Sequence, residues 1–230
     1  MLKDYLRRSR SPRYSIVFAL PLLALYEGLS AALSGSAVAG VRNGADVLLK
    51  TLFVALAGGA AVLVWRDLRR SGERLRLGVF GWMLAESALY AAVFGFVVGW
   101  LTTLVLQGPR ALSAGGAAAL DLHTQLVVSL GAGIYEELLF RVILVGGLMW
   151  VAQRVLGAGR VVSAALAVAV SALVFSAFHY VGALGDTFTL ASFTFRAIAG
   201  VAFSALYVSR GFGIAAWTHA LYDLGLSLIA

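Results

Sequence analysis

Long apolar segments separated by short basic ones constrain this chain more than any other feature of its sequence. Runs such as residues 60–65 are continuously apolar instead of alternating with polar residues, which is not the pattern of a transmembrane barrel. Hydrophobic residues make up 61% of the 230 residues, charged residues only 13%, and the mean hydropathy is +0.91. Soluble domains are usually about 45–50% apolar. The sequence therefore predicts an all-α fold, a polytopic integral membrane bundle.

We predict about seven spans, with six or eight as open alternatives, in one intramembrane domain over residues 1–230. The predicted spans are residues 14–33, 46–65, 80–106, 123–155, 161–180, 190–208 and 211–229. The net charge of +7 comes from Arg and Lys in short connecting segments. This is the positive-inside pattern of membrane topology, so it does not indicate nucleic-acid binding. It places the N-terminus in the cytoplasm, most simply of a bacterial inner membrane.

Two further features limit the architecture and the chemistry. The span at 123–155 exceeds the roughly 20 residues that a crossing needs, so we expect it to be tilted, to be broken near Gly131 and Gly133, or to extend into the cytoplasm. The chain contains no cysteine, which excludes disulfides, thiolate metal sites and cysteine nucleophiles.

Three charged residues, Glu136, Glu137 and Arg141, lie inside that long apolar span. A charge at the centre of a bilayer costs at least roughly 2.5–3.5 kcal/mol, so such a cluster is expected to have a function. Glu137 and Arg141 are one helical turn apart, with the acid first, which favours an ion pair. Glu136 is rotated by about 100° from Glu137 and cannot share that partner equally. We therefore predict a structural pair and one carboxylate that is available for chemistry.

Two further polar clusters occur in later spans. Phe175 precedes His179 by one turn, and His219 precedes Asp223 by one turn. Asp223 is thus predicted to orient the His219 imidazole, and Phe175 to shield His179 or to contact substrate. Because polar residues in a membrane bundle face its interior, we expect the three helices to meet at one cavity.

This set of residues is suited to hydrolysis. A carboxylate beside an imidazole can act as a general base toward water, and a second imidazole can stabilise the oxyanion formed at an amide carbonyl. The pattern therefore favours peptide hydrolysis without a covalent intermediate. The same Glu136, His179, His219 and Asp223 are also a possible zinc ligand set, which remains an alternative.

The ordered motifs EExxxR (residues 136–141), FxxxH (175–179) and HxxxN/D (219–223) resemble those of the CPBP family, which comprises CAAX prenyl endopeptidases and Abi bacteriocin-processing proteins. The resemblance covers a motif-bearing core of about residues 122–230. It implies an intramembrane protease that needs no metal or other cofactor and acts on a membrane-associated protein or peptide. By the same resemblance, Glu136 and His179 activate water, His219 and Asp223 form the oxyanion site, and Glu137 and Arg141 brace the helix.

One departure and several alternatives accompany this interpretation. Prenyl endopeptidases usually carry Asn where this chain has Asp223, which bears on the substrate more than on hydrolysis. A bacteriocin-immunity or scaffold protein and a proton-coupled transporter are the non-enzymatic alternatives. Glu27 and Glu86 are buried acids outside the motifs and have no assigned role. The helical depths of Glu136 and His179 favour a site in the outer half of the membrane.

Overall fold

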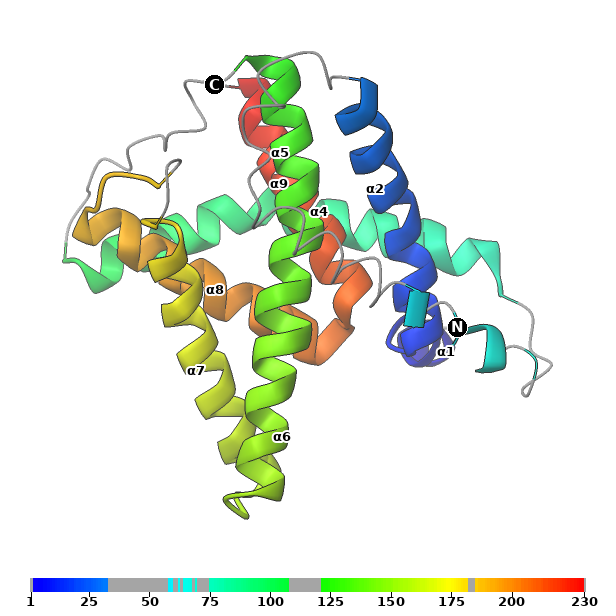
Figure 1. Cartoon of the computed structure of the whole chain (residues 1–230). Coiled ribbons are helices and arrows are strands. Elements are labelled where there is room, and N and C mark those ends of the chain that lie inside the picture. Colours follow the sequence, from blue (N-terminus) through cyan, green and yellow to red (C-terminus); the bar gives the residue numbers. More distant parts are fainter. Residues whose placement is uncertain are drawn as a thin grey trace.

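The structure is a computed structural model that describes residues 2–32, 58–59, 62, 64–67, 69, 75–107, 121–181 and 185–229 (Figure 1). Every regular element in these ranges is helical, which confirms the predicted all-α membrane bundle. The helices in chain order are α1 (Leu2–Ser9), α2 (Pro12–Ala32), α4 (Leu77–Val105), α5 (Leu122–Glu136), η3 (Glu137–Val145), α6 (Gly146–Arg154), α7 (Arg160–Phe178), α8 (Leu190–Arg210) and α9 (Phe212–Ile229).

Within the described ranges, four helices are long and apolar enough to cross a membrane, namely α2, α4, α7 and α8. They coincide with the predicted spans at 14–33, 80–106, 161–180 and 190–208. The predicted span at 46–65 lies almost entirely outside the described residues. The span predicted at 123–155 is divided among α5, η3 and α6, and α9 carries the polar residues His219 and Asp223 in its middle. The count of about seven therefore stays a prediction.

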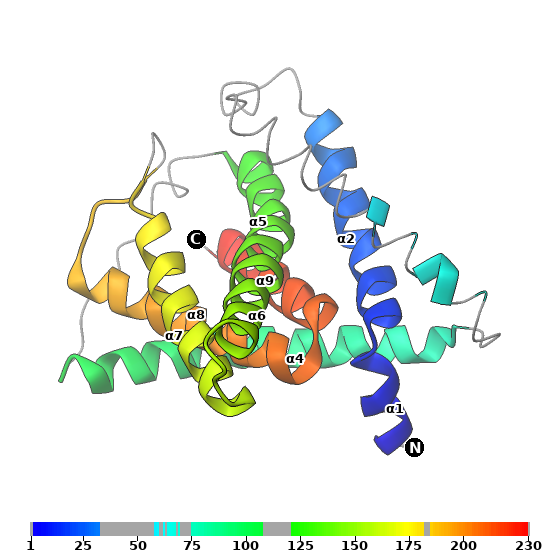
Figure 2. The same cartoon turned by 60° about the horizontal axis from the view of Figure 1, so that its bottom comes forward.

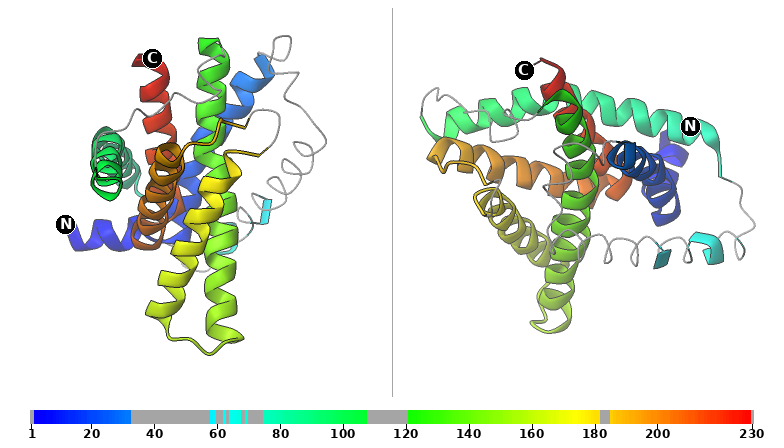
Figure 3. Two further views of the ribbon diagram at one scale, coloured as in Figure 1. Left: turned by 90° about the vertical axis from the view of Figure 1, so that its left-hand side faces the viewer. Right: turned by 45° about the horizontal axis from the view of Figure 1, so that its top comes forward.

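Helix α9 lies at the centre of the bundle. It packs against α2, α4, α5, α8 and η3, and the left view of Figure 3 shows it between α4 and α5. Small side chains allow this crowding, because the first half of α9 buries Gly213, Ile214, Ala215, Ala216, Thr218, His219 and Ala220. A polar residue on this part of α9 is consequently surrounded by other helices and not by lipid.

The axes of the helices around α9 run mainly in two directions. The α5, η3 and α6 segments form one continuous column, with α7 packed against α6 and η3 (Figures 1 and 2). Helices α4 and α8 cross this column steeply, since both are seen nearly end-on where the column stands upright (Figure 3, left). The column starts at Asp121, whose carboxylate accepts a hydrogen bond from the Thr124 backbone nitrogen at 3.1 Å. Bonds from the Thr124 hydroxyl and backbone lower the pKa of Asp121, so this cap keeps its charge.

Of the alternatives given for the long span, a break near Gly131 and Gly133 does not occur, because α5 runs through both residues. Their function is close packing. A Cβ atom on Gly133 would lie 2.6 Å from the Ala220 Cβ and 2.8 Å from the Ala216 carbonyl oxygen of α9. The irregularity occurs six residues after Gly131, where the column changes from α-helix to the π-helix η3 at Glu137. Such wide turns are rare and are concentrated at functional sites.

Substitution of Gly133 by Ala should lower stability by about 1–3 kcal/mol, because the new methyl group overlaps the backbone of α9. Thermal unfolding of the purified protein in detergent measures this loss. Gly147→Ala is the matched control, since no heavy atom lies within 4 Å of a Cβ built there. Alanine is the better helix former, so this control should unfold at the wild-type temperature or above it. Equal melting temperatures for both variants would contradict the tight α5–α9 contact.

Candidate active site

The structure brings together four side chains from the three motifs. Glu136 ends α5, His179 directly follows α7, and His219 and Asp223 lie on α9. The Glu136 Oε2 atom is 3.9 Å from the Nε2 atoms of both His179 and His219. The His219 Nε2 atom is in turn 3.4 Å from the Asp223 Oδ2 atom. The predicted convergence of the three motif helices is thus present in the structure.

The cluster has a partly open layer and a buried layer. The side chains of Glu136 and His179 are each 24% exposed, and that of Asp223 is 26% exposed. The His219 side chain is only 6% exposed, and those of Glu137 and Arg141 are fully buried. The first three side chains are therefore partly accessible, although the Glu136 Oε2 atom itself is buried.

His179 is oriented by the backbone of its own helix. Its Nδ1 atom is 2.8 Å from the Phe175 carbonyl oxygen. Because a carbonyl can only accept, Nδ1 donates to it, and Nε2 is the ring nitrogen on the side of Glu136. The Phe175 ring meets the imidazole edge-on, with centroids 4.7 Å apart. This places Phe175 beside the site, as its spacing from His179 predicts.

The backbone of His179 has a partner outside the three motifs, Asp186, which is in turn paired with Arg196. The Asp186 backbone nitrogen donates to the His179 carbonyl at 2.9 Å. The Asp186 carboxylate pairs with Arg196 of α8, which also contacts Ser192 and the Tyr180 hydroxyl. The available signal was an acid and a base flanking the start of an apolar span. This clamp makes Arg196 a positioning residue for His179.

His219 is held on its other side by Glu137. The His219 Nδ1 atom lies 2.8 Å from the Glu137 Oε1 atom, and the Phe203 ring of α8 stacks on the imidazole at 4.3 Å. The one-turn spacing on α9 predicts that Asp223 alone orients the His219 imidazole. In the structure Asp223 instead lies on the Nε2 side, and Glu137 accepts a hydrogen bond from Nδ1–H. The orienting carboxylate thus comes from a different helix.

The predicted ion pair between Glu137 and Arg141 is confirmed, with 3.2 Å between Oε1 and Nη1. Within the described part of the chain, the guanidinium nitrogens have no hydrogen-bond partner. The cation instead lies over the rings of Phe175 and Phe203, at 4.4 and 5.3 Å from their centroids. Its charge is therefore balanced by one carboxylate and by aromatic faces. Glu137 links this cation to His219 in a buried chain of charges.

The π-helix gives this buried chain its local geometry. Its wider turn begins at Glu137 and includes Arg141. The Ser171 hydroxyl of α7 donates to the Phe140 carbonyl inside η3 at 2.8 Å. A neighbouring helix thus supports the backbone where the regular α-helical pattern is interrupted.

Glu27 and Glu86 lie outside the site. Arg210 of α8 donates to Glu86 at 2.6 and 2.7 Å, and the hydroxyls of Tyr5 and Tyr90 donate to it as well. This network ties α1 and α8 to α4. Glu27 accepts a hydrogen bond from the Tyr135 hydroxyl at 3.2 Å, and its side chain is exposed, so the prediction that this acid is buried is wrong.

The donor geometry also bears on the zinc alternative. In the described ranges, no group of three or more His, Asp or Glu side chains is arranged to hold a metal ion. Tetrahedral zinc with bonds of roughly 2.1 Å would hold neighbouring donors roughly 3.4 Å apart. The Glu136 carboxylate is 3.9 Å from both imidazoles, which is wider than this spacing.

Comparison with known proteins gives one match. A family model described as type II CAAX prenyl endopeptidase Rce1-like matches residues 118–225. That range contains Glu136, His179, His219 and Asp223 together with the π-helix. No curated protein and no solved structure gives a significant match.

Proposed function

We propose that this chain hydrolyses peptide bonds of membrane-associated proteins within the bilayer. Residues 118–225 belong to the Rce1-like family of type II CAAX prenyl endopeptidases. The chain is therefore a CAAX-protease-like membrane enzyme. The observation that carries this proposal is the position of one carboxylate 3.9 Å from two imidazoles contributed by different helices. All three groups reach the same point in an otherwise apolar bundle.

Glu136 and His179 are the proposed water-activating pair. A separation of 3.9 Å is too long for a direct hydrogen bond, but it lets one water molecule bridge the Glu136 Oε2 and His179 Nε2 atoms. The Glu136 Oε2 atom is buried and has no hydrogen-bond partner within the described residues, so its acceptor positions are available to this proposed water. Glu136 takes a proton from this water while the oxygen attacks the substrate carbonyl. The same proton then passes to the leaving amine, so no covalent enzyme intermediate forms.

His219 is the proposed oxyanion donor. Its Nδ1–H donates a hydrogen bond to Glu137. This bond fixes the ring and leaves Nε2 directed toward Glu136 and Asp223. With a proton on each nitrogen, His219 can donate Nε2–H to the negative oxygen that develops on the carbonyl. In the resting site, Asp223 accepts the hydrogen bond from this Nε2–H. During the reaction the substrate oxygen takes the place of Asp223 as the acceptor.

The substrate class follows from the family and from the position of the site. A membrane-associated protein or peptide can place its chain beside side chains that are about a quarter exposed. The carboxylate of Asp223 stands where an amide is usual in prenyl endopeptidases, so the requirement for a prenyl group is best tested directly. We also propose the bacterial inner membrane, a cytoplasmic N-terminus and about seven spans, from the basic connecting segments.

The experiment uses purified protein in detergent with one membrane-anchored reporter peptide, made with and without a prenyl group. We expect cleavage by the wild type and none by the His179→Ala variant, and we expect cleavage to persist in EDTA and in 1,10-phenanthroline. The two peptides show whether a prenyl group is needed.

Two outcomes contradict these proposals. Stoichiometric zinc in the protein, with activity lost on chelation and restored by zinc, would establish the metal-dependent alternative. If neither peptide nor a digest of total membrane proteins is cleaved by folded protein, the scaffold or immunity role is favoured.

A further inference from the structure

A large cavity lies on the opposite face of the α5–η3 column from the candidate active site. Its volume is about 1130 Å³, slightly above the roughly 300–1,000 Å³ of common small-molecule sites. Ile134, Leu138 and Val142 of the column line it. Glu136 is two residues from Ile134 and projects to the other side of the helix. None of the four proposed catalytic residues is among its lining residues.

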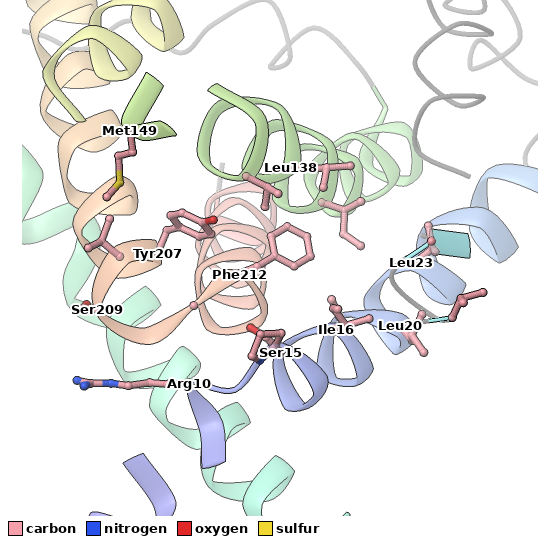
Figure 4. Close-up of a pocket in the computed structure, with 18 of the residues that line it drawn as sticks. Arg10, Ser15, Ile16, Leu20, Leu23, Leu138, Met149, Tyr207, Ser209 and Phe212 are labelled. Atoms are coloured by element: carbon pink, nitrogen blue, oxygen red, sulfur yellow. The ribbon is translucent and has the colours of Figure 1, made fainter. Parts of the chain in front are cut away.

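Most of the wall is apolar and comes from elements that are far apart in the sequence. Figure 4 shows Ile16, Leu20 and Leu23 of α2 along one side. Tyr207 and Phe212, near the junction of α8 and α9, reach into the middle of the cavity (Figure 4). This lining fits a flexible hydrocarbon chain better than a polar solute.

The cavity also has a cationic part. Arg10, at the junction of α1 and α2, and Arg160, the first residue of α7, both line it, together with Ser209 near the end of α8. In Figure 4, Arg10 and Ser209 lie on one side of the cavity, away from Leu20 and Leu23. The ends of three helices thus supply the polar groups.

The two arginines differ from the basic residues around them. Arg7 and Arg8 are paired with Asp4, and Arg210 is paired with Glu86. In the part of the chain that the structure describes, Arg10 and Arg160 have no ion-pair or hydrogen-bond partner. The cavity therefore combines apolar walls with two uncompensated positive charges.

We propose that this cavity binds an anionic phospholipid, with its phosphate at Arg10 and Arg160 and an acyl chain along the wall formed by α2 and the α5–η3 column. Burying a chain gains little relative to the bilayer, so selectivity comes from the charged headgroup. The Tyr207 hydroxyl, which has no partner among the described residues, is available to donate to an ester oxygen of the lipid. A prenyl chain alone has no anionic group for the two arginines, and the cavity faces away from Glu136.

Native mass spectrometry of the detergent-purified protein tests this proposal with phosphatidylglycerol and phosphatidylcholine of identical acyl chains. We expect one tightly bound phosphatidylglycerol and a clear preference for it over phosphatidylcholine. A charge near an anionic headgroup contributes about fivefold, so Arg10→Gln with Arg160→Gln should reduce the preference roughly 25-fold. Changing both arginines to Lys keeps the charges and should retain most of it.

The matched control is Arg154→Gln, which removes an exposed arginine of α6 that does not line the cavity. Its lipid preference should equal that of the wild type. An equal loss in this control would show that only general surface charge attracts the lipid and would overturn the proposal. Equal binding of both lipids by the wild type would also overturn it, as would displacement of bound lipid by a prenylated peptide but not by added phosphatidylglycerol.

A second variant tests the apolar wall independently of charge. Ile16→Trp adds bulk on the α2 side of the cavity and leaves both arginines in place. We expect weaker retention of phosphatidylglycerol with an unchanged melting temperature in detergent. Undiminished retention would place the lipid outside the cavity and so contradict the proposal.

Discussion

Replacement of Glu136 by Gln should reduce peptide hydrolysis by about 10²–10⁴-fold, the range associated with loss of a general base. Gln has nearly the same shape but cannot accept a proton from the water that bridges to His179. The Glu136 side chain is partly exposed, and its Oε2 atom has no hydrogen-bond partner among the described residues. The change should therefore leave the fold intact and lower turnover much more than substrate binding.

The measurement is steady-state cleavage of the reporter peptide by purified protein, together with its melting temperature. Glu27→Gln is the matched control, because it makes the same chemical change at an exposed carboxylate that accepts a hydrogen bond from Tyr135 and lies outside the site. It should retain wild-type activity. A folded Glu136→Gln variant with wild-type turnover would refute the proposed base.

The second large effect concerns the buried pair of Glu137 and Arg141. Glu137→Gln or Arg141→Met alone should destabilise the protein by about 3–5 kcal/mol, because each leaves its partner as an uncompensated buried charge. The double variant removes both charges and should be clearly more stable than either single variant. Its activity should nevertheless stay low, because His219 has lost the carboxylate that fixes its Nδ1 proton.

Thermal unfolding in detergent for the four members of this cycle measures the coupling. Arg7→Gln is the surface comparison, since Arg7 is largely exposed in its pair with Asp4 and should contribute at most about 1 kcal/mol. Additive losses for Glu137 and Arg141 would contradict a coupled buried pair. Full activity in the double variant would contradict the role of Glu137 at His219.

Local spacing predicted the contacts that lie within one helix. The pairs Glu137–Arg141, Phe175–His179 and His219–Asp223 each follow from a separation of four residues, and each is present in the structure. The convergence of the three motif helices followed from polar residues in apolar spans, because such residues avoid lipid. Their catalytic roles stay predictions.

Contacts between distant segments could not be obtained in this way. The bond between Glu137 and His219 joins residues 82 positions apart, and the pair of Arg210 and Glu86 joins residues 124 apart. The π-helix was not predicted either, and within it the Phe140 carbonyl accepts a hydrogen bond from Ser171 of α7, a contact between segments that local spacing does not indicate. The role of a glycine in a helix is also hard to predict, because it can break the helix or allow another helix to pack closely. At Gly133 the close packing of α9 shows that the second role applies.

The central position of α9 also has a consequence for the timing of assembly. In chain order α9 follows η3, α7 and α8, and it alone supplies His219 and Asp223. In the proposed mechanism His219 donates to the oxyanion, so a chain whose α9 has not yet been synthesised lacks this donor although Glu136 and His179 are already present. We therefore expect peptide hydrolysis only after α9 has packed between α4 and α5, which would limit cleavage of neighbouring proteins during membrane insertion.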